Sequence, residues 1–175
     1  MFQVRDGDTA KLGILFERHH VRLYNFLVRL TNRRELSEDL VQEVFLRILR
    51  YSQTFRGEAA FTVWMYRLAR NAASDHFRKW RRESLTSEDG GEQADDAPLP
   101  DEDLERGDSS AFLKAALARL PADKREVLIL ARYQELKYEE VGQILGCAVG
   151  TVKAKVHRAL KELKKEFEML SQEKL

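Results

Sequence analysis

A chain of 175 residues with a formal net charge of +1 has room for one medium-sized domain or two small ones. Its single cysteine excludes an internal disulfide, and it shows neither a signal-peptide pattern nor the apolar run of about 20 residues that crosses a bilayer, so we expect a cytoplasmic protein without membrane insertion. Three prolines, long stretches of helical periodicity and little β-branched alternation predict an all-α fold.

The small net charge hides a strong segregation along the chain. Residues 1–82 hold 16 Lys and Arg against 9 Asp and Glu, residues 83–109 hold one Arg against 11 acidic residues, and residues 110–175 hold 13 basic against 9 acidic residues. The middle segment also has few large apolar residues, so it cannot bury enough surface to offset the entropy of ordering. We therefore predict two small helical domains, 1–82 and 110–175, joined by a flexible acidic linker, 83–109.

The first predicted domain begins with a helix from about residue 9 to residue 30. The next helix has Ser37 as its predicted N-cap and buries an apolar stripe of Leu40, Val41, Val44, Phe45, Ile48 and Leu49. The other face of that helix presents Asp39, Gln42, Glu43 and Leu46. An exposed leucine among polar residues is a hint of a partner surface, although single exposed leucines usually have no function.

The third helix of this domain, residues 61–82, combines aromatic and basic side chains. It follows an aperiodic stretch around Gly57, and its exposed face holds Arg67, Arg70, Asn71 and Arg78, flanked by Trp64, Tyr66, Phe77 and Trp80. A binder of single-stranded nucleic acid needs this combination, because cations contact phosphates while rings stack on bases, at about 1–3 kcal/mol per base. The alternative is that many of these aromatic residues only fill the core.

The second predicted domain ends in a helix-turn-helix. A helix over residues 110–119 and another after Pro121, with a core of Val127, Leu128, Leu130 and Tyr133, precede it. Residues 138–163 then form two helices around a turn at Gly146, and the second helix has an apolar stripe of Val149, Val152, Val156, Leu160, Leu163 and Phe167. We expect Cys147, in the turn, to be a small core residue rather than a redox sensor.

The face opposite that stripe carries small and basic side chains, namely Thr151, Lys153, Ala154, Lys155 and Arg158. In a helix-turn-helix, this face of the second helix enters the DNA major groove. A helix pair that only builds a core is the alternative interpretation.

Four local patterns together resemble conserved regions two and four of the extracytoplasmic-function (ECF) sigma factors. They are EDLVQEVFLRIL at 38–49, FRGEAAFTVWMYRLARN at 55–71, LPADKREVLIL at 120–130 and YEEVGQILGCAVGTVKAKVHRA at 138–159. The resemblance implies a non-enzymatic factor without a cofactor or metal that binds bacterial RNA polymerase core, directs it to promoter DNA and is held by an anti-sigma factor. A stand-alone helix-turn-helix regulator of transcription is the alternative.

The resemblance also implies roles for the residues on the three faces. Asp39, Gln42, Glu43 and Leu46 would contact the polymerase clamp. Phe55, Ala60, Phe61, Trp64, Arg67, Arg70, Asn71 and Arg78 would melt the promoter −10 element and capture a flipped base of it. Thr151, Lys153, Ala154, Lys155 and Arg158 would read the −35 element, although Ala154 replaces a serine that is common in the family.

The acidic linker leaves two hypotheses open. Its charge is consistent with a plain spacer between two promoter-binding domains. It is also consistent with a mimic of nucleic acid that lies against the basic faces and suppresses DNA binding by the free protein.

Overall fold

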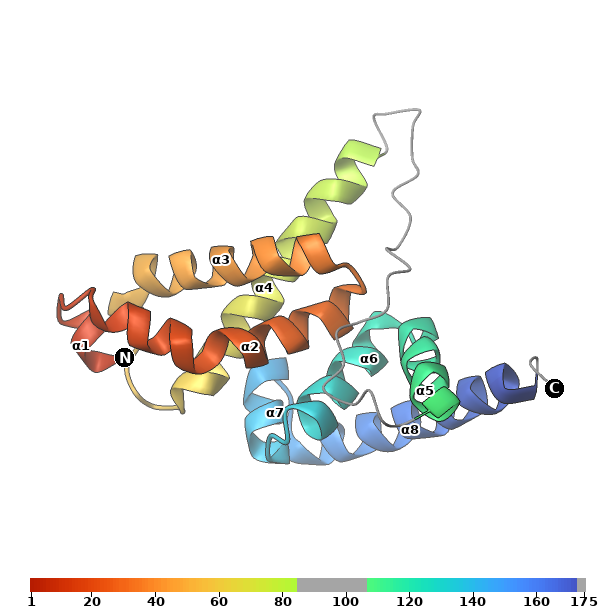
Figure 1. Ribbon diagram of the computed structural model, residues 1–175. Helices are drawn as coiled ribbons and strands as arrows, with labels where there is room; N and C mark the ends of the chain where they lie inside the picture. Colours follow the sequence, from red (N-terminus) through yellow and green to blue (C-terminus); the bar gives the residue numbers. More distant parts are fainter. Residues whose placement is uncertain (85–106, 173–175) are drawn as a thin grey trace. The chain divides into compact units, whose positions relative to one another are not determined.

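The computed structural model describes residues 1–84 and 107–172, and within these residues all regular structure is helical (Figure 1). The chain divides into two compact units, Met1–Asp96 and Ala97–Leu175. The predicted all-α fold with two small helical domains is therefore confirmed. Helix α4 ends at Ser84 and helix α5 begins at Gly107, so most of the predicted acidic linker lies outside the described residues.

The N-terminal unit is built on three long helices. They are α2 (Lys11–Thr31), α3 (Arg34–Arg50) and α4 (Phe61–Ser84), preceded by the short helix α1 (Phe2–Arg5), and a 3₁₀ turn, η1 (Ser52–Thr54), follows α3. Helices α2 and α3 lie side by side and α4 packs against both (Figure 1). Their facing stripes form one core, whose largest fully buried side chains are Leu23, Phe26, Leu27, Val28, Val44, Ile48, Met65 and Tyr66.

The start of α3 differs from the sequence prediction. The helix begins at Arg34, after Asn32 has taken a left-handed conformation with φ of 57°, so Ser37 is not the N-cap. Ser37 is fully buried in the first turn, where its hydroxyl donates to the Arg33 carbonyl at 2.5 Å and shares a hydrogen bond of 2.9 Å with the Thr31 hydroxyl. A serine whose hydroxyl bonds to the carbonyl four residues earlier fits inside a helix, which is why this capping prediction was wrong.

The C-terminal unit packs several short helices against one long one. It contains α5 (Gly107–Arg119), α6 (Ala122–Leu128), a π-helical turn η2 (Ile129–Tyr133), α7 (Tyr138–Leu145) and the long helix α8 (Val149–Gln172). Helix α8 contacts α5, α6 and α7, and the side-chain ammonium of Lys124 in α6 pairs with Glu162 in α8. The core is made of Ala116, Leu117, Leu120, Val127, Leu128, Ile129, Leu130, Val141, Ile144, Val152, Val156 and Ala159.

Four side chains differ from the sequence prediction in whether they are buried or exposed. Leu49, Tyr133 and Leu160 were expected in the core but are exposed, whereas Tyr66 was expected beside the nucleic-acid face but is only 2% exposed. Because a helix has 3.6 residues per turn, two adjacent residues point in different directions, and only one of them can face the centre of the core. Ile48 and Ala159 occupy those central positions instead of Leu49 and Leu160.

Candidate nucleic-acid interface

The outer face of α3 presents the four side chains that the sequence predicted for polymerase contact. Asp39, Gln42 and Leu46 are exposed and Glu43 is half-buried. At 59%, Leu46 is the most exposed large apolar side chain among the described residues, and Leu49, one turn further along, is 38% exposed. An apolar pair bordered by polar side chains on an otherwise packed helix is a surface to which a partner can bind.

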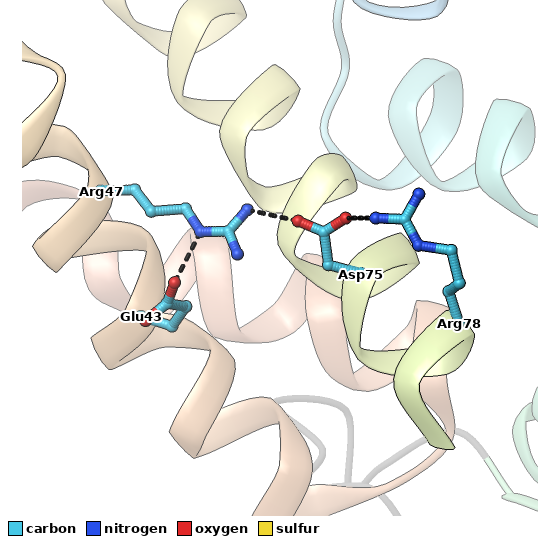
Figure 2. A network of polar contacts seen from close by, with 4 residues as sticks. All are labelled: Glu43, Arg47, Asp75 and Arg78. Carbon is cyan, nitrogen blue, oxygen red and sulfur yellow. Dashed lines mark hydrogen bonds and ion pairs between the residues drawn. The ribbon is translucent and has the colours of Figure 1, made fainter. Parts of the chain in front are cut away.

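A polar network links this face to α4 (Figure 2). The Arg47 guanidinium donates to Glu43 Oε1 at 2.6 Å on its own helix and to Asp75 Oδ2 at 3.0 Å on α4. Arg78 donates to the other oxygen of Asp75 at 2.6 Å. Burial alone would lower the pKa of Arg47, but its hydrogen bonds to Glu43 and Asp75 outweigh burial and raise that pKa. The Asp75 carboxylate thus holds α3 against α4 and positions Arg78.

Rings gather where the segment of residues 52–60 meets α4. The Phe55 ring lies 5.4 Å from Trp64 and 6.3 Å from Phe61, between ring centroids, and Phe61 lies 5.2 Å from the ring of His19 on α2. Phe55 is only 6% exposed, whereas Phe61 and Trp64 are half-buried and Ala60 is exposed. The structure therefore brings these predicted residues together, with Phe55 beneath the rings that reach the surface.

Basic and aromatic groups follow along the exposed side of α4. Arg67, Asn71 and Arg78 are exposed and Arg70 is half-buried. Phe77 and Trp80 are also exposed, at 40% and 38%. These rings are available for stacking beside cationic groups, which is the arrangement that single-stranded nucleic acid favours.

Tyr66 belongs to the core instead of that surface. Its ring forms an edge-to-face contact with Phe26, with 5.1 Å between centroids. Burial raises the pKa of Tyr66 to about 12, and the positive charge of Arg22 only partly opposes this rise in pKa. Tyr66 therefore belongs to the packing between α4 and α2.

The turn between α7 and α8 depends on two glycines. Gly146 takes a φ of +67° at the end of α7, as the sequence predicted. Gly142, which the sequence pattern did not single out, lies one turn earlier, and a Cβ there would be 2.7 Å from the backbone oxygen of Cys147. The Cys147 amide donates to the Gly142 carbonyl at 3.0 Å, so the chain reverses directly against the α7 backbone. Cys147 itself is only half-buried.

The first turns of α8 present a surface suited to phosphate and base contacts. Thr151, Lys153, Ala154 and Arg158 are exposed and Lys155 is half-buried, while Val152 and Val156 hold the opposite side in the core. Residues 149–161 contain no acidic residue, so the potential of this surface is positive. The Arg158 guanidinium lies along its own helix, donating to the Ala154 carbonyl at 3.3 Å.

The described residues hold neither a metal-binding cluster nor a membrane-spanning helix. Residues 1–84 and 107–172 contain no group of three or more His, Cys, Asp or Glu side chains that could hold a metal ion. No helix in the same residues has the length and apolar character to cross a membrane.

The chain is similar to known proteins over nearly its whole length. The family model of Sigma-70 region 2 matches residues 15–83, and that of Sigma-70, region 4 matches residues 113–163. The ECF RNA polymerase sigma factor SigX of Bacillus subtilis (strain 168) is 34% identical over 165 residues, covering 91% of this chain and 85% of SigX. The RNA polymerase sigma factor CarQ of Myxococcus xanthus is 33% identical over 175 residues, covering 97% of this chain and 98% of CarQ.

Solved structures agree with this similarity. The sigma factor RpoE, in its co-crystal structure with the anti-sigma factor NepR from Bartonella quintana, has a TM-score of 0.78 and 28% identity, covering 89% of this chain and 96% of that chain. Both region models match, each within one compact unit, and relatives at 33% and 34% identity span most of the sequence. The chain therefore belongs to the extracytoplasmic-function (ECF) family of RNA polymerase sigma factors.

Proposed function

We propose that this sigma factor, which directs RNA polymerase to promoters, divides the work between its two units: the N-terminal unit binds the polymerase core and melts the −10 element, and the C-terminal unit reads the −35 element. One observation carries this proposal. The unit that matches region 2 exposes both an apolar α3 face and an aromatic and basic α4 face, whereas the unit that matches region 4 exposes a basic helix of a helix-turn-helix.

On α3, the polymerase core would cover Leu46 together with Asp39, Gln42 and Glu43. Full burial of an exposed leucine contributes about 1.5–3 kcal/mol, so Leu46 is the expected centre of this contact. The carboxylates at its edge provide specificity and speed of association more than affinity. The enzymatic step belongs to the polymerase, and this chain acts as a non-enzymatic factor in the cytoplasm.

On the α4 side, a base that leaves the duplex would enter beside Phe61 and Trp64. Extracting a base costs a few kcal/mol, and a pocket offsets this cost by stacking and by hydrogen bonds to the base edge. The two half-buried rings offer the stacking surface, and the exposed Asn71 has both a donor and an acceptor for a base edge. Phe55 forms the floor under these rings, Ala60 leaves the entrance open, and Arg67, Arg70 and Arg78 contact phosphates.

On α8, the −35 element would take the exposed side of the helix into its major groove. Lysine and arginine suit the O6 and N7 atoms of guanine, and threonine contacts bases or phosphates. We assign Lys155 and Arg158 to base edges and Thr151 and Lys153 to phosphates. Ala154 has only a methyl group to offer, which suits a thymine methyl.

The family relationship also favours a protein inhibitor as a partner. The relative RpoE was crystallised with the anti-sigma factor NepR. We propose that an anti-sigma factor covers the same α3 and α8 faces in this protein, because both faces are exposed in the free chain.

Transcription in vitro tests the proposed function. The purified chain is mixed with bacterial core RNA polymerase and a fragmented genomic library, and the start sites of the transcripts are sequenced. We expect co-elution with the core enzyme on size exclusion and transcripts that start downstream of shared −35 and −10 motifs. A chain that binds duplex DNA but neither co-elutes nor starts transcription would be a stand-alone regulator, and the proposal would be wrong.

A further inference from the structure

Helix α1 packs against the segment that precedes α4. The Phe2 ring lies 5.3 Å from the Phe55 ring, between centroids, and Val4 is 2% exposed. The Gln53 side-chain amide donates to the Arg5 carbonyl, and the Arg5 guanidinium lies over the Phe2 ring at 4.9 Å from its centroid. Residues 2–5 therefore contact residues 53–57 through an aromatic pair, a side-chain hydrogen bond and the approach of Gly57 to the Phe2 ring.

Gly57 shows how close this contact is. Its φ of +78° belongs to the left-handed region, and a Cβ at Gly57 would overlap the ring of Phe2. The backbone of the segment thus lies directly on the Phe2 ring. The Phe55 amide donates to the Ser52 carbonyl, and the Ala60 carbonyl accepts from the Trp64 amide. Between them, the backbone of residues 56–59 makes no hydrogen bond to another backbone group of the described residues, so side-chain contacts hold these residues in place.

The contacts continue from α1 to Phe55, Phe61 and Trp64, the rings assigned above to the flipped base and called here the candidate base pocket. The Phe55 ring, which lies beside Phe2, also lies 5.4 Å from Trp64 and 6.3 Å from Phe61, between ring centroids. Phe2 is nevertheless 49% exposed, so its burial adds little to the core of the unit. Helix α1 also precedes residue 15, where the match to the Sigma-70 region 2 model begins.

We propose that helix α1 is a brace for the base pocket, in which Phe2 and Gly57 are positioning residues for the flipped base of the −10 element. This inference rests on the proposed function of residues 55–61. The brace holds Phe55, and through it Phe61 and Trp64, in the arrangement that the base enters. The pocket is then ordered before DNA arrives, and binding does not have to order it.

The test compares polymerase holoenzymes that carry wild-type or variant chain. Each is titrated with a single-stranded −10 oligonucleotide from a promoter found by transcription in vitro, and with the same oligonucleotide made abasic at the flipped position. The dissociation constant for the abasic oligonucleotide, divided by that for the intact one, measures recognition of the base alone. We expect Phe2→Ala to lower this ratio about two- to tenfold, as loss of one aromatic contact predicts, and Phe2→Leu to lower it less.

Ile14→Ala is the matched control, because Ile14 is similarly exposed, at 51%, and lies on α2. This control should leave the ratio unchanged, and all variants should bind core polymerase as the wild type does. A variant that merely folds less well would bind both oligonucleotides more weakly by the same factor, and the ratio would not change. That result for Phe2→Ala would show that α1 does not brace the base pocket.

A double-mutant cycle adds a second readout. Gly57→Ala should lower the ratio strongly, but less so when Phe2→Ala has already removed the ring that the new Cβ would meet. If the effects of Gly57→Ala and Phe2→Ala on the ratio were additive, the contact between Gly57 and the Phe2 ring would not contribute to base recognition. If the wild-type holoenzyme itself binds both oligonucleotides equally, the assignment of residues 55–61 to the base is wrong, and the brace is excluded with it.

Discussion

His19 is the residue next to the candidate pocket whose charge responds to its surroundings. Its ring is half-buried on α2 and lies 5.2 Å from the Phe61 ring, between centroids. Burial lowers the pKa of His19, and the neighbouring positive charges of Arg18 and Arg22 lower it further. The imidazole is therefore mostly neutral at neutral pH, which avoids a desolvated positive charge beside the ring.

This lowered pKa predicts how stability changes with pH. Between about pH 7.5 and about pH 5.5, the unfolded chain protonates His19 at its ordinary pKa near 6.5, whereas the folded chain resists protonation. The unfolded state then binds more protons, so the free energy of unfolding falls as the pH falls. His19→Gln removes this contribution, and urea denaturation at the two pH values should show a smaller decrease for the variant than for the wild type.

If the free energy of unfolding fell equally in the wild type and in His19→Gln, protonation of His19 would not cause the loss of stability. Salt separates the two causes of the lowered pKa, because ions screen the repulsion from Arg18 and Arg22 but do not change burial. Since burial is the larger cause, most of the difference between wild type and variant should persist at high salt.

At the scale of elements, the α7–α8 turn makes Gly142 an exception to the rule that alanine is more stable than glycine inside a helix. Replacing a glycine inside a helix by alanine normally stabilises the helix by about 1 kcal/mol. At Gly142, however, the added Cβ would meet the backbone oxygen of Cys147 at 2.7 Å, and a backbone atom cannot move away as a flexible side chain can. We expect Gly142→Ala to destabilise the C-terminal unit by about 1–3 kcal/mol, as overpacking does, in thermal or urea unfolding.

Gly150 offers a control on the neighbouring helix. It lies in the first turn of α8, and a Cβ added there would meet no atom within 4 Å apart from its chain neighbours and the backbone of its own helix, so Gly150→Ala should be neutral or stabilising by up to about 1 kcal/mol. Equal effects of the two substitutions would show that the turn is looser than the structure describes. If α8 enters the −35 groove as proposed, affinity for −35 duplex DNA should also fall with Gly142→Ala, because the turn sets the angle between α7 and α8.

These elements also show what periodicity predicts and what it does not. The stripes that contain Val44 and Val156 follow from spacing alone, because one face of each helix must be buried. The pairing of Arg47 with Asp75 joins residues 28 positions apart and depends on how α3 and α4 pack together, which no local pattern encodes. Gly142 was missed for the same reason, since the atom that it must avoid belongs to the turn.

The candidate site was predictable to a similar extent. Exposure of Leu46 and Arg158 followed from the opposite faces of amphipathic helices, and the structure has both side chains exposed. The depth of Phe55 did not follow, because it is set by contact with Phe2, near the start of the chain, and with Trp64 in the next helix.

At the scale of the whole molecule, each unit has its own core and its own exposed face. The N-terminal core includes Phe26 and Met65, and the C-terminal core includes Leu128 and Val152. When one unit has bound the polymerase and the −10 element, the covalent connection raises the local concentration of the other unit near the −35 element. If the units divide the work as proposed, the two faces combine their binding free energies at one promoter, although each unit folds around a separate core.

This proposed division predicts that substitutions on α8 and on α3 impair promoter binding and transcription in different ways. Arg158→Ala, on α8, should weaken holoenzyme binding to a duplex promoter about five- to hundredfold, the effect of losing about 1–3 kcal/mol at a base contact. It should leave transcription unchanged on a template whose −10 region is already melted and which lacks a −35 element. Leu46→Asp, on α3, should abolish transcription on both templates, because a charge would replace the apolar centre of the proposed polymerase contact.

Binding and run-off transcription with both templates check these outcomes, and each variant serves as the control for the other. The isolated Leu46→Asp chain should still bind a −35 duplex as the wild type does, because α3 and α8 belong to different units. If Arg158→Ala impairs the melted template as strongly as the duplex, α8 acts through the polymerase and not through the −35 groove. The separation of roles between the units would then be wrong, even though the chain would still be a sigma factor.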